Sequence, residues 1–244
     1  MKYINQILSL MLTLPLALSV GCAGRRTVNE SSVTTDNSVT VTEMSGSSAA
    51  EATSVTLTSV TGSGESKSNI LVVYFSRTGE QYNVGVIDKG NTAIVAEAIA
   101  ERTGADFFEV IPEEDHYPMT YDELAEVAKN EQNSNARPQY KGSIPDLSKY
   151  DKIFIGAPVW WGDWPMIMYT FFENNSDALS GKTLIPFSTH EGSGLSGFDK
   201  ELSSAFPDSE VLEGLAVRGS DCQNKPDDVR ARVNEWVSEL GYYL

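Results

Sequence analysis

Cysteine and histidine are scarce in this sequence, with two of each among 244 residues. Cys22 and Cys222 are too few to build a disulfide scaffold. The chain has no Cys-x-x-Cys pair and no cysteine–histidine cluster at metal-site spacing, and His116 and His190 are too few for a His-rich centre. The sequence therefore predicts neither a disulfide framework nor a metal site.

Positive charge is also scarce, because 18 basic residues stand against 34 acidic ones and give a formal net charge of −16. A chain of this sign is repelled by phosphate backbones and by anionic lipid, so we expect no nucleic-acid partner. Residues 1–69 carry four basic and five acidic side chains, which leaves a net charge of −15 on residues 70–244. This acidity fits a partner with a basic surface, or simply keeps the protein dispersed.

Long hydrophobic runs are missing apart from one near the start. The apolar stretch from Ile7 to Val20 follows Lys2, is interrupted by Pro15, and is too short to span a bilayer. It is typical of a signal peptide over residues 1–22. The sequence Ser19-Val20-Gly21-Cys22 resembles a bacterial lipobox, although the usual leucine stands one position early, at Leu18. We expect an exported lipoprotein anchored through Cys22 on the extracytoplasmic side of a bacterial membrane, with simple secretion as the alternative.

Aromatic residues are absent from residues 23–69, and serine and threonine dominate that stretch. No apolar periodicity persists there, so the segment cannot bury enough surface to offset its chain entropy. We interpret residues 23–69 as a disordered, flexible tether between the membrane anchor and a folded domain at residues 70–244.

Strand and helix patterns alternate from residue 70 onward. Short apolar runs rich in β-formers predict strands at 70–75, 105–111, 152–157, 183–188 and 211–217. Segments with helical periodicity predict helices at 91–103, 120–133, 165–173, 195–204 and 226–240. This alternation predicts an α/β fold in which helices cover both faces of a parallel sheet. Ligands of such sheets bind at the carboxyl ends of the strands, so the loops that follow the strands are the candidate sites.

The loop after the first predicted strand has the composition of a phosphate cradle. Ser76-Arg77-Thr78-Gly79 follows the strand, and Gly90-Asn91-Thr92 opens the next helix. Hydroxyl groups, glycine and the free N–H groups of a helix start can bind a phosphate together. The alternative is that Ser76 and Thr92 only cap the helix and form the turn.

The loop after the third predicted strand holds three of the four tryptophans of the chain, within the sequence from Pro158 to Pro165. Tryptophan at the ligand edge of a sheet can form a flat wall for a planar ring. The alternative is that these rings fill the domain core, which we expect for one of the three.

The loop after the fourth predicted strand is rich in glycine. Gly192, Gly194 and Gly197 match the G-x-G-x-x-G pattern of dinucleotide-binding proteins, with Glu213 downstream. That pattern belongs in the first strand–turn–helix unit, tight against the strand, and here it lies in the fourth. We therefore expect a flexible loop that offers backbone N–H and C=O groups to a flat polar ring, with His190 near the ligand or solvating the loop edge.

Together these segments resemble the flavodoxin family, most closely its exported bacterial branch, from residue 70 to about residue 240. The resemblance rests on the following sequences, in this order and spacing: Tyr74-Phe75-Ser76-Arg77-Thr78-Gly79 with Asn91-Thr92, Tyr150-Asp151, Gly156-Ala157-Pro158-Val159-Trp160-Trp161-Gly162, Gly181-Lys182, and Pro186-Phe187-Ser188-Thr189. It implies a flavodoxin-like three-layer sandwich with a five-stranded parallel sheet in the order 2-1-3-4-5. It also implies one non-covalent FMN, with its phosphate in the first loop and its isoalloxazine between the third and fourth loops.

Carried over residue by residue, the resemblance implies three groups of cofactor-binding residues. The phosphate would be held by Ser76, Arg77, Thr78, Gly79, Asn91 and Thr92. One side of the ring would be flanked by Pro158, Val159, Trp160, Trp161 and Gly162. The other edge would be framed by Thr189, His190, Glu191, Gly192, Ser193 and Gly194. An eleven-residue insert, 80–90, departs from the family pattern, and we expect it to fold over the cofactor with Tyr82 available to cover it.

The resemblance implies an electron carrier that works with redox protein partners, and in which the flavin performs the redox chemistry without a catalytic acid, base or nucleophile from the protein. Two alternatives remain open at this point. One is an FMN-dependent oxidoreductase that passes electrons from a nicotinamide to a quinone or a similar acceptor. The other is a binding module of the same fold without a cofactor.

Overall fold

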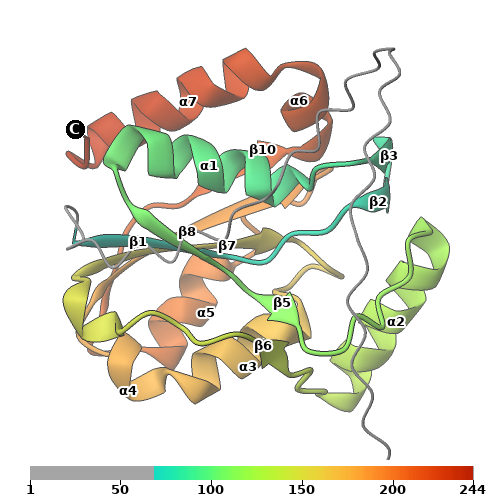
Figure 1. Cartoon of the computed structure of the whole chain (residues 1–244), viewed down its shortest axis with the longest axis horizontal. Helices are drawn as coiled ribbons and strands as arrows, with labels where there is room; N and C mark the ends of the chain where they lie inside the picture. Colours follow the sequence, from blue (N-terminus) through green and yellow to red (C-terminus); the bar gives the residue numbers. More distant parts are fainter. Residues whose placement is uncertain (1–68, 244) are drawn as a thin grey trace, which may run out of the picture. The chain divides into compact units, whose positions relative to one another are not determined.

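Buried runs of apolar residues form a central parallel sheet. The computed structural model describes residues 69–243, and its five main strands are β1 (Ile70–Tyr74), β4 (Asp106–Glu109), β7 (Lys152–Pro158), β8 (Thr183–His190) and β10 (Leu215–Arg218). They lie in the order β10-β8-β7-β1-β4, and every neighbouring pair is parallel (Figure 1). Counted along the chain this order is 2-1-3-4-5, which confirms the predicted fold class.

Alternate residues of β1 enter two different hydrophobic cores. Leu71 and Val73 pack into the core on one face of the sheet, whereas Val72 packs into the core on the other. This division follows from the strand geometry, in which successive side chains point to opposite faces. All five residues of β1 are buried, which explains why its sequence is continuously apolar, as is typical of a strand covered on both faces.

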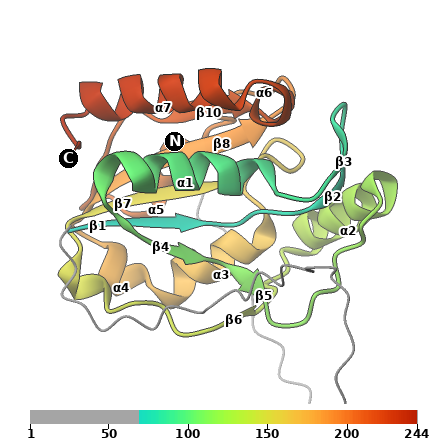
Figure 2. The ribbon, with the colours of Figure 1, turned by 45° about the horizontal axis from the view of Figure 1, so that its top comes forward.

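Helices cover both faces of the sheet. Figures 1 and 2 show α1 (Asn91–Thr103) and α7 (Pro226–Glu239) on one face, with the short helix α6 (Gly219–Asn224) at the end of α7. The opposite face carries α3 (Met166–Asn174), α4 (Ser176–Leu179) and α5 (Phe198–Ala205). The three-layer arrangement therefore leaves the carboxyl ends of the strands open for loops.

Helix α2 (Tyr121–Ser134) lies beside a small hairpin beyond the carboxyl ends of the strands (Figure 1). The hairpin consists of β2 (Gly79–Gln81) and β3 (Gly85–Ile87), which pair antiparallel, and it begins one residue before the predicted insert. The backbone N–H of Glu80 donates to the carbonyl of Met119, and this bond ties the hairpin to the segment before α2. Both elements consequently contribute to the ligand edge.

Several predicted boundaries differ from the structure. Helix α1 has the predicted bounds, but α5 begins at Phe198 rather than at residue 195, because Gly197 has a φ of +83° and cannot continue a helix. Helix α3 has Pro165 as its N-cap rather than in its first turn. Thr120 is the N-cap of α2 as predicted, but its hydroxyl donates to Glu123 and accepts no hydrogen bond from a backbone N–H of the helix.

The last predicted strand, 211–217, is interrupted. Residues Glu210–Val211 form β9, which pairs with the start of β8, and the pairing resumes only with β10. Pro186 of β8 lies at the interruption and has no N–H to donate, so the ladder cannot be continuous there. Gly214 packs closely against Pro186, because a Cβ added to Gly214 would lie 2.6 Å from the carbonyl oxygen of Pro186.

Besides the hairpin, five elements of the described residues were not predicted: the antiparallel pair β5 (Ile111–Pro112) and β6 (Tyr140–Lys141), the 3-10 helix η1 (Leu147–Lys149), and the short helices α4 and α6. No helix within residues 69–243 has the length and apolar character needed to cross a membrane. The predicted signal peptide, the lipidation at Cys22 and almost all of the predicted tether lie outside the described residues.

Candidate functional site

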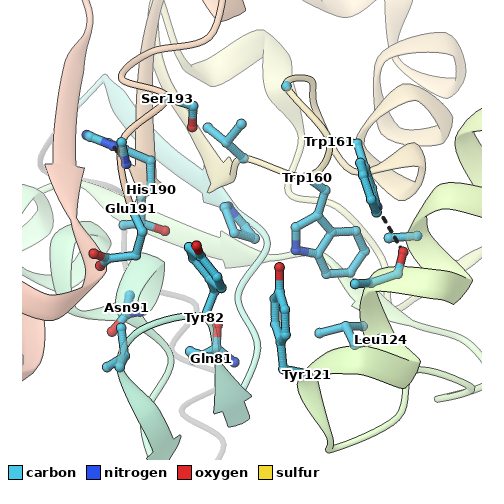
Figure 3. A pocket seen from close by; sticks show the side chains of 18 of the residues that line it. Gln81, Tyr82, Asn91, Tyr121, Leu124, Trp160, Trp161, His190, Glu191 and Ser193 are labelled. Carbon is cyan, nitrogen blue, oxygen red and sulfur yellow. Dashed lines mark hydrogen bonds between the residues drawn. The ribbon is translucent and has the colours of Figure 1, made fainter.

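A cavity of about 420 Å³ opens at the carboxyl ends of β7 and β8. Its walls come from five parts of the chain: the hairpin, the start of α1, helix α2, the tryptophan loop (residues 158–165) and the glycine loop (residues 189–197) (Figure 3). The lining residues are Glu80, Gln81, Tyr82, Val84, Asn91, Tyr121, Leu124, Ala125, Ala128, Pro158, Val159, Trp160, Trp161, Gly162, Thr189, His190, Glu191, Gly192 and Ser193. Eleven of the residues predicted from the sequence are among them, namely Asn91, Pro158 to Gly162, and Thr189 to Ser193.

The tryptophan loop is a tight turn that projects two indole rings. Trp160 and Asp163 exchange backbone hydrogen bonds of 3.0 and 3.1 Å, and the two residues between them, Trp161 and Gly162, have φ values of +51° and +80°. Positive φ at both central positions is the pattern of a type I′ turn. Trp161 is 54% exposed, and its indole N–H donates to the carbonyl of Ala125 on α2 at 2.8 Å. The turn is therefore held against α2.

Trp160 is fixed by aromatic neighbours. Its ring contacts Phe75 edge-on at a centroid distance of 5.3 Å and Tyr117 at 5.2 Å. The hydroxyl of Tyr117 donates to the buried carboxylate of Glu131, which also bonds His116 at 2.7 Å. Trp160 therefore has a defined orientation at the cavity wall.

Trp164 occupies the core, as expected for one tryptophan of this loop. It is 1% exposed and stacks on Phe198 with a ring separation of 3.5 Å. The loop thus divides its rings between cavity and core.

The glycine loop is ordered by His190. The backbone N–H of Gly192 donates to Nδ1 of His190 at 2.8 Å, so the proton of the neutral ring is assigned to Nε2. Burial and the nearby Arg218 guanidinium lower the pKa of His190 below its usual value, which keeps the ring neutral at pH 7. The ring can therefore present an N–H donor at the cavity. Gly194 was also predicted but does not line the cavity, and its carbonyl accepts a hydrogen bond from the hydroxyl of Ser188.

Two predicted residues of the site are tied to α6. The carboxylate of Glu191 accepts from the backbone N–H of Ser220 at 2.6 Å and from its hydroxyl at 3.1 Å. The side-chain carbonyl of Asn91 accepts from Gln223 at 2.7 Å. An added Cβ at Gly219 would collide with Asn91, so the start of α6 needs glycine to pack this closely.

The serine–threonine turn lies against the start of α1. The hydroxyl of Ser76 accepts from the backbone N–H of Ala93 at 3.1 Å, and an added Cβ at Gly90 would collide with that hydroxyl and lie 2.7 Å from the carbonyl oxygen of Arg77. Within residues 69–243, no hydrogen-bond acceptor is found for the backbone N–H groups of Arg77 and Thr78. These two groups and the free N–H groups of the helix start can bind an anion.

The buried hydroxyls of Thr92 and Thr189 are 2.7 Å apart. This contact joins the start of α1 to the end of β8, and so connects the loop after the first predicted strand with the loop after the fourth. Neither Thr92 nor the residues Ser76, Arg77, Thr78 and Gly79 line the cavity itself.

The Arg77 side chain is directed away from the phosphate position that the resemblance implies. Its guanidinium is bonded to the carboxylate of Asp115 and the carbonyl of Tyr117, both at 2.7 Å. The side chain is 9% exposed, and its Nε is buried without a partner among the described residues. In this arrangement Arg77 anchors the segment before α2, and only its backbone N–H is available to a phosphate.

Sequence reasoning missed the second half of the cavity lining. Tyr121, Leu124, Ala125 and Ala128 lie on one face of α2 at helical spacing and line the cavity. On the hairpin, Glu80, Gln81 and Val84 were not predicted, whereas Tyr82 was expected to cover the ligand. The helix pattern alone could not reveal that α2 leaves the sheet, because an apolar face looks the same whether it covers a core or a cavity.

The flavodoxin family model matches residues 69–239 of this chain. A candidate flavoprotein from Bacteroides eggerthii is 29% identical, with 70% of this chain and 97% of its own chain covered and a TM-score of 0.53. Another from Bacteroides uniformis is also 29% identical, with 70% and 98% covered and a TM-score of 0.54. A Lactobacillus acidophilus flavoprotein solved in complex with FMN is 22% identical, with 65% and 97% covered and a TM-score of 0.47. No curated protein matches the sequence.

Proposed function

The chain belongs to the flavodoxin family, and from this premise we propose that its folded domain holds one FMN non-covalently and transfers electrons through it. One observation carries the proposal. Three segments far apart in the sequence, at residues 76–79, 158–162 and 189–193, follow the neighbouring strands β1, β7 and β8. The last two line the cavity, and the first lies against the start of α1, whose Thr92 contacts Thr189. Such a position, at a switch in strand order, is where sheets of this kind bind their ligands.

The residues present fit a flat ring that carries a phosphate. The backbone N–H groups of Arg77 and Thr78 and the start of α1 would hold the phosphate, helped by the helix dipole. Trp160 would form one wall for the ring, and the backbone of Gly192 and Ser193 would supply polar groups at its edge. When bound, FMN supplies the redox chemistry itself.

The protein's own residues would position the ring and protect it from water. Phe75 and Tyr117 hold the Trp160 indole in one orientation. His190 remains neutral at pH 7 and directs its Nε2–H as a donor, because its Nδ1 is occupied by the N–H of Gly192. Tyr82 of the hairpin lines the cavity and would cover the bound ring.

The visible absorption spectrum of the purified full chain, before and after addition of FMN, tests this proposal. We expect the flavin bands to shift and to saturate at one FMN per chain. A colourless protein that leaves the spectrum of added FMN unchanged would contradict the proposal and favour a binding module without cofactor.

The electron donor is tested separately, by rapid mixing of the FMN-loaded protein with NADPH. We expect slow reduction, because no lysine or arginine lines the cavity to bind the phosphates of a nicotinamide within the described part of the chain. Fast direct reduction would instead favour a nicotinamide-dependent oxidoreductase.

Export, lipid attachment at Cys22 and a basic redox protein as partner are further parts of this proposal. They are supported by the composition of residues 1–22 and by the acidity of residues 70–244. Membrane fractionation of the producing bacterium should find the native chain in the membrane and a Cys22→Ala variant outside it. Equal distribution of both would contradict lipid attachment.

A further inference from the structure

The side chain of Arg77 connects the serine–threonine turn with the segment before α2. Its guanidinium donates to the carboxylate of Asp115 and to the backbone carbonyl of Tyr117, both at 2.7 Å. It also contacts the sulfur of Met119 at 3.8 Å. One side chain of the turn thus contacts three alternate residues of a segment that lies 38 to 42 residues further along the chain.

The guanidinium is buried in this position. The Arg77 side chain is 9% exposed, and its guanidinium carbon lies 5.4 Å from the centre of the Tyr117 ring. Its Nε is buried without an acceptor among the described residues, which costs free energy. The charge-assisted bond to Asp115 and the contact with the ring offset that cost. The side chain would lose both if it turned toward a phosphate.

Tyr117 links Arg77 to the cavity wall. Arg77 bonds the backbone carbonyl of Tyr117, and the hydroxyl of Tyr117 donates to Glu131 at 3.1 Å, so this residue is fixed at both ends. Its ring meets the Trp160 indole edge-on, with the centroids 5.2 Å apart. Trp160 forms the side of the cavity opposite His190 (Figure 3). A shift of Tyr117 would therefore change the angle of this indole.

The turn and the segment also pack closely at Gly79. A Cβ added there would lie 2.7 Å from the carbonyl oxygen of Met119, and the same carbonyl accepts from the backbone N–H of Glu80 at 2.7 Å. This backbone contact holds the segment at Met119. The Arg77 side chain extends the contact to Tyr117, the residue that touches Trp160.

We propose that Arg77 is a positioning residue for the flavin ring and that its guanidinium does not bind the phosphate. By holding Tyr117, it sets the angle of the Trp160 indole, which would form one wall for the ring. The inference rests on the proposed function, since it presupposes that FMN occupies the cavity. It moves the effect of this side chain from the phosphate, where the family resemblance places it, to the ring.

The variant Arg77→Lys tests the proposal, because it keeps the positive charge but not the planar fork that bonds Asp115 and Tyr117 together. The affinity of the full chain is measured for FMN and for riboflavin, which has the same ring without the phosphate. We expect both affinities to fall by the same factor, about tenfold. A loss confined to FMN would show that the guanidinium binds the phosphate, and unchanged affinity for both would show that it positions nothing. Either result overturns the proposal.

Circular dichroism in the visible flavin bands provides a second readout, which a general loss of stability would not move. It is recorded at saturating FMN on protein that urea unfolding has shown to be folded. We expect the band intensities to change in Arg77→Lys, because the Trp160 indole beside the ring has a different angle. Bands identical to those of the native chain would contradict the proposal.

Two further variants complete the test. Asp115→Asn changes an exposed partner of the guanidinium and serves if Arg77→Lys does not fold. It should weaken both ligands by a smaller common factor, and a loss for FMN alone would again overturn the proposal. The matched control is Arg137→Lys, because Arg137 also pairs with a carboxylate, Glu173, and lies 5.3 Å from the centre of a tyrosine ring, but does not line the cavity. The control should bind both ligands as the native chain does.

The native chain separates this inference from the proposed function. A native chain that takes up neither FMN nor riboflavin contradicts the proposed function. A native chain that binds FMN but no riboflavin retains the proposed function and overturns this inference alone, because contacts with the ring would then contribute too little for Arg77 to act through them.

Discussion

Gly90 sets how closely the serine–threonine turn approaches helix α1. An alanine there would place its Cβ into the Ser76 hydroxyl and near the carbonyl of Arg77. We expect Gly90→Ala to lower FMN affinity by about tenfold or more and to destabilise the fold by about 1–3 kcal/mol, because the turn must move away. FMN titration and urea unfolding measure the two effects.

Gly181→Asn is the control for that substitution. Gly181 has a φ of +77° with open space around it, and asparagine tolerates this left-handed region. The control should bind FMN as the native chain does. If Gly90→Ala also binds FMN normally, the close approach of turn and helix is not needed for the cofactor.

His116 and Glu131 form a titratable contact behind Trp160. Burial opposes the charged ring, but the hydrogen bond to Glu131 and the neighbouring carboxylates outweigh it and raise the pKa of His116. A raised pKa in the folded state means that the contact stabilises the fold fully below the unfolded pKa of about 6.5. This stabilisation is lost as the pH rises through the folded pKa.

His116→Gln should therefore destabilise the protein more at about pH 5.5 than at about pH 8.5. The His116 side chain is largely exposed, so we expect a difference of about 1 kcal/mol or less. Urea unfolding at both pH values measures it. Arg137→Gln, which removes the ion pair with Glu173, is the control and should show the same loss at both. An equal loss for His116→Gln would show that the contact does not titrate in this range.

At the scale of single residues, the sequence predicted the cavity-facing part of the tryptophan and glycine loops. Residue type and position after a strand are sufficient to predict these residues, because the carboxyl ends of parallel strands bring the following loops to one edge of the sheet. The bonding of Arg77 to Asp115 and Tyr117 could not be predicted, since it depends on the path of a loop 38 residues further along the chain.

Among the elements, the hairpin and α2 depend on each other at the ligand edge. The carboxylate of Glu80 is placed at the start of α2, where it satisfies the N–H of Tyr121 and interacts well with the helix dipole. Glu80→Gln should change global stability by about 1 kcal/mol or less but speed amide hydrogen exchange at Tyr121.

Hydrogen exchange followed by NMR or mass spectrometry measures this effect. The matched control is Glu126→Gln, which changes an exposed residue on the same helix. If Tyr121 exchanges at the same rate in both variants, the Glu80 contact does not hold the start of α2.

Helices with a strong periodic pattern were predicted best, and α1 has the predicted bounds because Gly90 and Gly104 stop the helix at each end. The break between β9 and β10 was not foreseen, although Pro186 is visible in the sequence. The position of Pro186 opposite the edge strand depends on strand register, which the sequence alone does not provide.

For the whole molecule, the acidity of residues 70–244 should affect the redox potential of bound FMN. Each electron added to the flavin adds negative charge beside a domain of net charge −15. We expect bound FMN to have a lower midpoint potential than free FMN, because like charges repel.

Salt should reduce this effect. Raising the ionic strength from about 10 mM to about 500 mM shortens the Debye length severalfold. We expect the potential to rise by roughly 30 mV relative to free FMN in the same buffers, which for two electrons is about tenfold in equilibrium constant. Potentiometric titration at both ionic strengths measures it, and a potential that does not respond to salt would contradict an electrostatic origin.

The alternating pattern predicts a parallel sheet with its loops at one edge, and the family resemblance implies its strand order. The departure of α2 from the sheet does not follow from either. The position of α2 depends on how the eleven-residue insert packs against it. The family pattern has no counterpart of this insert, so the contact between the insert and α2 could not be predicted.

The gap between β9 and β10 affects how copies of the protein meet. An uninterrupted outer strand would offer a long row of open N–H and C=O groups on which a second sheet could grow. Here the edge of the described sheet consists of two short strands, β9 and β10, which are separated beside Pro186. This edge therefore offers no continuous set of N–H and C=O groups with which a strand of a second copy could pair.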